Sequence, residues 1–170
     1  MFIIEALWFF LPAFVANQLP GLAAKFNLPG NMPVSVRWLG TNKTWAAYYT
    51  AGLAGVVTIY LQRQFPIPHV QILVDYHRHE LWLVGLLFGL GAVLGDHIES
   101  FFKRRMGIKP GESWWPFDQL DYVAGSLIST APLVEWIGWL RLTAIFVTVL
   151  LLAWPVNYIG YKLKIRKVIM

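Results

Sequence analysis

Five apolar runs, separated by shorter polar stretches, give the sequence its pattern. They lie at about 2–19, 45–61, 80–94, 120–139 and 142–161. Each approaches the roughly 20 residues that a helix needs to cross the hydrocarbon core of a bilayer. We expect the third run to continue as helix into the polar stretch that follows it. The pattern therefore predicts an all-α integral membrane protein with five transmembrane helices, folded as a single polytopic domain over residues 1–170.

The basic residues predict how this bundle is oriented. Eleven of the fourteen Lys and Arg residues fall in the stretch at about 20–44, in the stretch at about 95–119 and in the tail. Such an excess marks the cytoplasmic side. We therefore expect the N-terminus outside, the C-terminus in the cytoplasm, and a polar cytoplasmic region built from these two loops. Within the first loop, the Pro and Gly residues of 28–40 predict a turn and no helix.

Composition supports the membrane assignment and narrows the chemistry. The chain is 57% hydrophobic and 14% charged, against the roughly 25% charged residues of soluble domains. There is no cysteine, which excludes disulfides, thiolate metal sites and cysteine nucleophiles. The net charge of +5 belongs with cytoplasmic loops at a cell membrane, so we expect membrane lipids as neighbours and no nucleic-acid partner.

Charge of both signs is concentrated between Gly95 and Tyr122, directly after the third apolar run. If that run stays helical, four polar residues with i, i+3, i+4 and i+7 spacing share one face: Asp96, Glu99, Ser100 and Lys103. Two carboxylates, a hydroxyl and an ammonium would then face the same volume at the inner edge of the membrane.

Asp118 and Asp121 form a second pair, with i, i+3 spacing, at the start of the fourth run. Carboxylates are costly at membrane depth and usually face a wet cavity or a partner, so we favour a functional role for both, and for Asp96. For Arg105, Lys109 and Glu112 we favour solvated helix ends. Carboxylates are good ligands for a Mg²⁺ ion that also binds substrate phosphates. The basic residues that lie between them in the sequence can bind the phosphates themselves.

A second group lies in LGTNKTW, residues 39–45, just before the second apolar run. Asn42 belongs to a turn, and Lys43 and Thr44 follow at the start of the helix, an arrangement that can cradle phosphate. The spacing is not that of a Walker A loop, and a capping Thr with a snorkelling Lys explains it equally well. Asn17, inside the first run, is either a substrate ligand or part of a hydrogen bond between helices.

Two familiar catalytic patterns are missing from the sequence. No Ser, His and acid set points to acyl transfer, and no HExxH motif is present. The chemistry therefore does not call for a nucleophile from the protein.

Taken in order, these motifs resemble the membrane cytidylyltransferases that make CDP-activated lipids. Bacterial CDP-diacylglycerol synthases carry SPxKTWEG, then GDxxxSxxKR, then PGHGGxxDRxD. Here the corresponding stretches are LGTNKTWAA, GDHIESFFKRRMGIKP and WWPFDQLDY. The third keeps the spacing of Asp118 and Asp121 but lacks the glycines and the arginine. That departure, the short chain and PAFVAN near the N-terminus are similar to the archaeal branch, the CDP-archaeol synthases.

The resemblance implies transfer of CMP from CTP to 2,3-bis-O-(geranylgeranyl)-sn-glycerol 1-phosphate, with Mg²⁺ as cofactor and pyrophosphate as the second product. CTP and this prenylated glycerol phosphate lipid are the partners it implies. It gives catalytic roles to Asp96, Lys103, Asp118 and Asp121. The metal ligands would be Asp96, Asp118 and Asp121, with no basis for separating the last two. The residues expected to bind CTP or lipid phosphate are Asn17, Asn42, Lys43, Thr44, Ser100, Lys103 and Arg104, with Glu99 nearby.

Three other hypotheses remain open on the sequence. The same chemistry can act on phosphatidate and give CDP-diacylglycerol. A small transporter can also carry membrane carboxylates, although these are expected near the midplane and here they gather at one face. A non-catalytic scaffold would use the charged stretch to bind a partner.

Overall fold

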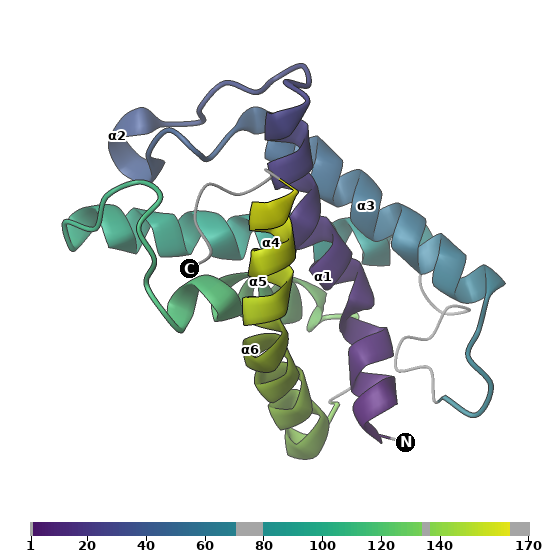
Figure 1. Ribbon diagram of the computed structural model, residues 1–170. Coiled ribbons are helices and arrows are strands. Elements are labelled where there is room, and N and C mark those ends of the chain that lie inside the picture. The colour runs from purple at the N-terminus through teal and green to yellow at the C-terminus, as the bar shows by residue number, and fades with distance from the viewer. Residues whose placement is uncertain (1, 71–79, 134–136, 164–170) are drawn as a thin grey trace.

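The computed structural model describes residues 2–70, 80–133 and 137–163 (Figure 1). In this part of the chain there are six helices and no strand: α1 (Phe2–Lys25), α2 (Val36–Leu39), α3 (Trp45–Gln64), α4 (Leu81–Arg105), α5 (Phe117–Thr130) and α6 (Trp139–Lys162). The prediction of an all-α protein is thus confirmed for the described residues. The basic tail beyond Leu163, along with His77 and His79, lies outside them.

Three helices are long and apolar enough to cross a membrane. They are Ile3–Lys25, Leu81–Arg105 and Trp139–Lys162. The expected continuation of the third run into the charged stretch is confirmed, because α4 ends only at Arg105. By contrast α5, with 14 residues, is shorter than the roughly 20 residues of a full crossing.

The boundaries differ from the sequence prediction in three places. The run at 120–139 is not one helix, because α5 ends at Thr130, two residues before Pro132, and Trp139 begins α6. Proline has no N–H to continue the helical hydrogen bonds, so the regular helix ends just before it. α1 continues past Pro20 to Lys25, which shortens the first loop. Within 28–40, α2 forms where a turn was expected, and Ser35 caps it by accepting a hydrogen bond from the Trp38 amide.

Close backbone contact holds α4 between α3 and α5, the two helices against which it packs most extensively. A Cβ on Gly89 would lie 2.1 Å from the carbonyl oxygen of Ala51 in α3. A Cβ on Gly95 would lie 2.1 Å from the carbonyl oxygen of Asp121 in α5. Small residues allow such approaches between membrane helices, and the second contact fixes where Asp121 stands relative to Asp96.

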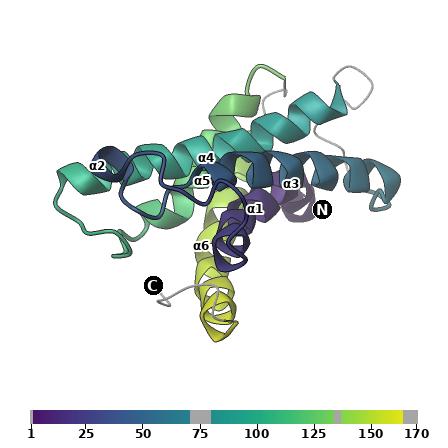
Figure 2. The same ribbon diagram turned by 90° about the horizontal axis from the view of Figure 1, so that it is seen from above.

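α6 stands steeply across α3 and α4 and packs mainly against α1 (Figure 2). Its contact with α1 has a polar clamp at each end. Arg141 Nη2 lies 2.7 Å from Glu5 Oε2 near the start of both helices. At the opposite end Lys25 Nζ donates a 2.8 Å hydrogen bond to the Leu163 carbonyl. The two helices therefore run side by side in the same direction.

Candidate functional site

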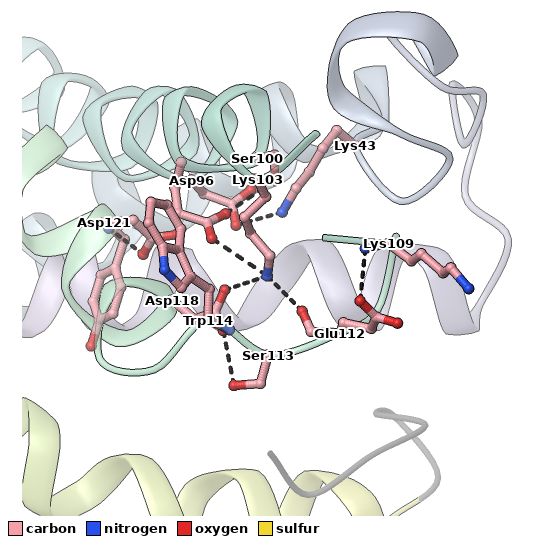
Figure 3. A network of polar contacts seen from close by, with 12 residues as sticks. Lys43, Asp96, Ser100, Lys103, Lys109, Glu112, Ser113, Trp114, Asp118 and Asp121 are labelled. Carbon is pink, nitrogen blue, oxygen red and sulfur yellow. Dashed lines mark hydrogen bonds and ion pairs between the residues drawn. The ribbon is translucent and has the colours of Figure 1, made fainter. Parts of the chain in front are cut away.

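A cavity of about 670 Å³ lies where the C-terminal half of α4 meets the loop before α3 and the start of α5. Its polar wall comes from these three segments, and Figure 3 shows how their side chains converge. Its opposite wall comes from α1 and α6 and includes Phe14, Val149, Leu152 and Val156. One space therefore joins a charged half to an apolar half.

Lys43 ties the first predicted motif to the second. Its Nζ lies 2.6 Å from Asp96 Oδ1, although the two residues are 53 positions apart in the sequence. The loop that carries Lys43 turns at Gly40, where φ is +88° and a Cβ would lie 3.2 Å from the ring of Pro110. A glycine at this turn lets the loop lie close against the segment after α4.

Lys103 is the centre of the second half of the network (Figure 3). Its Nζ donates hydrogen bonds of 2.6 Å to Asp118 Oδ1 and 2.6 Å to the Glu112 carbonyl, and lies 3.4 Å from Glu99 Oε1. The other oxygen of Asp118 accepts hydrogen bonds from the Ser113 hydroxyl, at 3.0 Å, and from the Trp114 amide. Both oxygens of Asp118 are therefore engaged by fixed donors.

Asp121 has different partners from Asp96 and Asp118. Its Oδ1 accepts a 2.5 Å hydrogen bond from the amide of Tyr122, its own neighbour in the chain. Within the described residues, no basic side chain forms an ion pair with it at 4.0 Å or less. It interacts electrostatically with Asp96 and with Lys43, which places these three groups together on the same side of the cavity.

Two groups that lie before the expected spanning segments, Lys43 before α3 and Asp118 before Leu120, have shifted pKa values. Burial acts to lower the pKa of Lys43, but the charge of Asp96 and the hydrogen bond to it outweigh burial and raise that pKa. Burial acts to raise the pKa of Asp118, but hydrogen bonds to Glu99, Lys103 and the Trp114 amide outweigh it and lower that pKa. Lys43 is therefore an ammonium and Asp118 a carboxylate at neutral pH.

Arg104 and Glu99 carry unused hydrogen-bonding capacity. Nε and Nη1 of Arg104 are buried, as is Oε1 of Glu99, and none of these atoms has a hydrogen-bond partner in the described part of the protein. Buried polar atoms are normally satisfied, so unpaired guanidinium nitrogens beside a cavity are donors available to an anionic ligand. A phosphate group fits that requirement because guanidinium binds it with two parallel hydrogen bonds.

The structure brings nearly all of the predicted site residues to this cavity. Its lining includes Asn17, Asn42, Lys43, Asp96, Glu99, Ser100, Lys103, Arg104, Asp118 and Asp121. Thr44 is not among the lining residues and occupies the N-cap position of α3, without a capping hydrogen bond from its side chain. Its role in binding substrate, like the roles of the others, stays a prediction.

Sequence reasoning missed polar groups on the wall formed by α1 and α6. Gln18 and Asn157 line the cavity there, together with the predicted Asn17. Asn157 is 8% exposed and lies in an apolar helix, where a polar side chain usually marks a functional position. The signal was present in the sequence, since Asn157 stands in the fifth apolar run as Asn17 stands in the first.

Similarity to known proteins identifies the family to which this chain belongs. A family model described as CarS-like, CDP-archaeol synthase, matches residues 1–170. This chain belongs to the CDP-archaeol synthase family. The family's member from Methanospirillum hungatei is 36% identical, with 93% of this chain and 98% of the relative covered. The member from Pyrococcus furiosus is 30% identical, with 98% and 97% covered.

A solved structure of the same kind agrees with the fold. It is described as an intramembrane enzyme for archaeal membrane lipids biosynthesis, and it superimposes with a TM-score of 0.69 at 29% identity. The match covers 92% of this chain and 94% of the other. The chain is thus a multi-pass membrane protein and a member of a cytidylyltransferase family.

Proposed function

We propose that the protein transfers CMP from CTP to the phosphate of 2,3-bis-O-(geranylgeranyl)-sn-glycerol 1-phosphate and releases pyrophosphate. The observation that carries this proposal is the two-sided cavity. Its charged wall holds Lys43, Lys103 and Arg104 among three aspartates, and its other wall is mainly apolar. The triphosphate of CTP needs a charged wall, and the chains of the lipid need an apolar wall beside it.

The basic side chains serve the phosphates of CTP. The unpaired guanidinium of Arg104 offers two hydrogen bonds, and Lys43 and Lys103 supply ammonium groups held at the same wall. Asn42 and Ser100 add neutral donors on the same lining. Held in this way, the charge that develops on the departing pyrophosphate is neutralised by groups that are already in place.

The acidic side chains fit a divalent cation that is shared with the nucleotide. In the described part of the chain no three acidic or histidine side chains gather as a complete ligand set. Mg²⁺ needs only one or two carboxylates when phosphate oxygens and water complete its shell, and Asp96 and Asp121 meet that requirement. Bound there, Mg²⁺ would neutralise charge on the phosphates. We assign Asp118, whose oxygens are engaged, to the orientation of Lys103.

The lipid serves as its own nucleophile. A non-bridging oxygen of the lipid phosphate attacks the α-phosphorus of CTP, the bond from that phosphorus to the bridging oxygen breaks, and pyrophosphate leaves with the electron pair. The protein contributes position and charge, which agrees with the absence of a nucleophile motif from the sequence. The apolar wall from α1 and α6 holds the prenyl chains beside the membrane, and the amides of Asn17 and Asn157 lie next to it.

We further propose a single domain with five crossings of the cell membrane, made by the three apolar helices, by α3 and by the apolar run that begins at Leu120 in α5. α5 alone, with 14 residues, is shorter than a full crossing. The polar contacts support this proposal because they lie at the two opposite ends of the helices. Glu5 pairs with Arg141 at one end, and Gln62 Nε2 donates to the Trp8 carbonyl there at 2.5 Å. The contacts of Lys25 and of the cavity lie at the other end. With the basic loops inside, α1 begins outside the cell and α6 ends in the cytoplasm.

The test is pyrophosphate release by the detergent-purified protein, supplied with CTP, Mg²⁺ and the geranylgeranyl ether lipid phosphate. Wild type would be compared with Asp96→Asn and with an EDTA control, and phosphatidate would be added as a competing acceptor. Lipid-dependent release that both the variant and EDTA abolish would support the proposal. Faster release with phosphatidate would reassign the substrate. No release with either lipid, from protein shown to be folded, would overturn the proposal.

A further inference from the structure

Lys43 reaches from the loop before α3 into the acidic side of the cavity, as Figure 3 shows. Its ammonium lies 2.6 Å from Asp96 Oδ1 and also attracts Asp121 and Glu99 electrostatically. Asp96 and Asp121 interact with each other as well. Two carboxylates close enough to interact repel each other unless a cation lies near both. In the protein without ligands, the ammonium of Lys43 is that cation.

The same two carboxylates are the pair that fits a divalent cation. A divalent cation bound to Asp96 would lie close to the ammonium of Lys43, which is 2.6 Å from Asp96 Oδ1. Repulsion between the two positive charges therefore opposes binding of the cation until Lys43 moves away. Displacement is unfavourable while Lys43 has no other anion to bind.

Lys43 is the more easily displaced of the two lysines. Lys103 is held by Asp118, by the Glu112 carbonyl and by Glu99, and its side chain is 8% exposed. The side chain of Lys43 makes one hydrogen bond within the described residues, to Asp96, and is 20% exposed. The triphosphate of CTP would give Lys43 a new partner at the same wall of the cavity.

From these contacts we infer that Lys43 occupies the metal position until CTP arrives, and that its transfer to the triphosphate frees Asp96, so that nucleotide and metal bind cooperatively. This inference rests on the proposed function and adds the order in which Lys43 changes partner and the metal binds. The metal alone binds weakly, and CTP and metal strengthen each other's binding by the same factor, as linkage requires. Coupling of this kind typically amounts to about 5- to 150-fold in affinity.

One substitution should then change the two affinities in opposite directions. In Lys43→Gln, Asp96 loses its ammonium partner and keeps only the 3.6 Å contact of its Oδ2 with His97 Nδ1, so metal binding without nucleotide becomes tighter. The same change removes a phosphate ligand, so CTP binding becomes weaker. Lys109→Gln is the matched control, because it removes the same charge from an exposed position whose side chain does not line the cavity.

The experiment is a Mn²⁺ titration of the full chain in detergent, followed by the electron paramagnetic resonance signal of free Mn²⁺, with and without CTP and with no lipid present. We expect Lys43→Gln to bind Mn²⁺ at least about 5-fold more tightly than wild type without CTP, and to lose most of the enhancement by CTP. Lys109→Gln should behave as wild type. Asp96→Asn should lose Mn²⁺ binding under both conditions.

The inference is overturned if Lys43→Gln binds Mn²⁺ without CTP as weakly as wild type, or more weakly. Lys43→Met would repeat the measurement if Lys43→Gln melts at a lower temperature than wild type. Failure of the proposed function looks different, because folded wild type would then bind no Mn²⁺ even with CTP and would release no pyrophosphate. Tight Mn²⁺ binding by wild type without nucleotide would overturn the inference and leave the transferase proposal standing.

Discussion

Lys103 donates a 2.6 Å hydrogen bond to Asp118 and thereby joins the last turn of α4 to the first turn of α5. The side chains are 8% and 22% exposed, so the pair is largely shielded from water. Lys103 therefore holds two helices in register and also presents its charge to the cavity. The stability of the fold and the geometry of the site depend on the same contact.

Replacing Lys103 with Met should destabilise the protein, because Glu99 and Asp118 lose the base that they share. Breaking an exposed pair costs about 1 kcal/mol at most, whereas breaking a fully buried pair costs about 3–5 kcal/mol. We expect a loss between these limits, measured by thermal unfolding in detergent. Arg105→Met removes a base two residues further along α4 that has no part in the pair, and it serves as the control. Equal stability of Lys103→Met and wild type would contradict this account.

Asp118 should make stability depend on pH at the acidic end. Its pKa in the folded protein is lowered, so its contribution is fully present above the unfolded value of about 3.9 and is lost as the pH falls through the folded value. The melting temperature of Asp118→Asn should therefore fall less than that of wild type when the pH is taken from 6 toward 3. Parallel curves for the two proteins would show that Asp118 titrates with its ordinary pKa.

Gly95→Ala should damage the site without removing any charged group. The added Cβ would lie 2.1 Å from the Asp121 carbonyl, so α5 has to move away from α4 and carry Asp121 away from Asp96. Overpacking of this kind typically costs about 1–3 kcal/mol, and we expect most of the pyrophosphate-release activity to be lost as well. Leu94→Ala alters an exposed neighbour and should retain activity. Full activity in Gly95→Ala would show that the close approach is dispensable.

Arg104→Lys should weaken CTP binding while leaving the fold intact. The buried Nε and Nη1 have no partner in the described part of the chain, so their loss leaves no protein group unpaired. A charge-assisted hydrogen bond contributes about 1.5–3 kcal/mol, which corresponds to a Kd for CTP that is about 10- to 100-fold higher. Isothermal titration with CTP and Mg²⁺ would measure the change, and an unchanged Kd would remove Arg104 from the binding site.

Asn157→Leu should change the KM for one substrate and not for the other. The residue lines the cavity from α6, on the apolar side, and is far from the cluster around Lys103 in the sequence. We expect a higher KM for the lipid phosphate, because an amide that can donate to the glycerol oxygens is lost, and an unchanged KM for CTP. Val156→Leu, a neighbour that keeps the wall apolar, is the control. A rise in the KM for CTP alone would place Asn157 in the nucleotide half.

Local patterns made most of the site predictable from the sequence. Asp96, Ser100 and Lys103 share a helical face by spacing alone, and the close Asp118 and Asp121 pair follows from the same rule. The contact between Lys43 and Asp96 was not predictable in this way, because it depends on how the loop before α3 folds over α4. The distinct surroundings of Asp118 and Asp121 also depend on the tertiary structure, since Ser113 and the Trp114 amide reach only one of them.

The boundaries of the helices were less predictable than their existence. An apolar run continues through Pro132 to Trp139, so hydropathy alone could not show that α5 ends at Thr130. Nor could it show α2, because a four-residue helix held by one cap leaves no periodic signal. In both places short-range backbone constraints decided the structure against the prevailing composition.

The two clamps between α1 and α6 fix the position of the apolar wall of the cavity. Glu5 pairs with Arg141, and Lys25 donates to the Leu163 carbonyl, so α6 is tied to α1 near its first turn and again at its C-terminus. The residues of α6 that line the cavity, from Val149 to Asn157, lie between these two contacts. A shift of this wall relative to α1 therefore requires that at least one of the two contacts break.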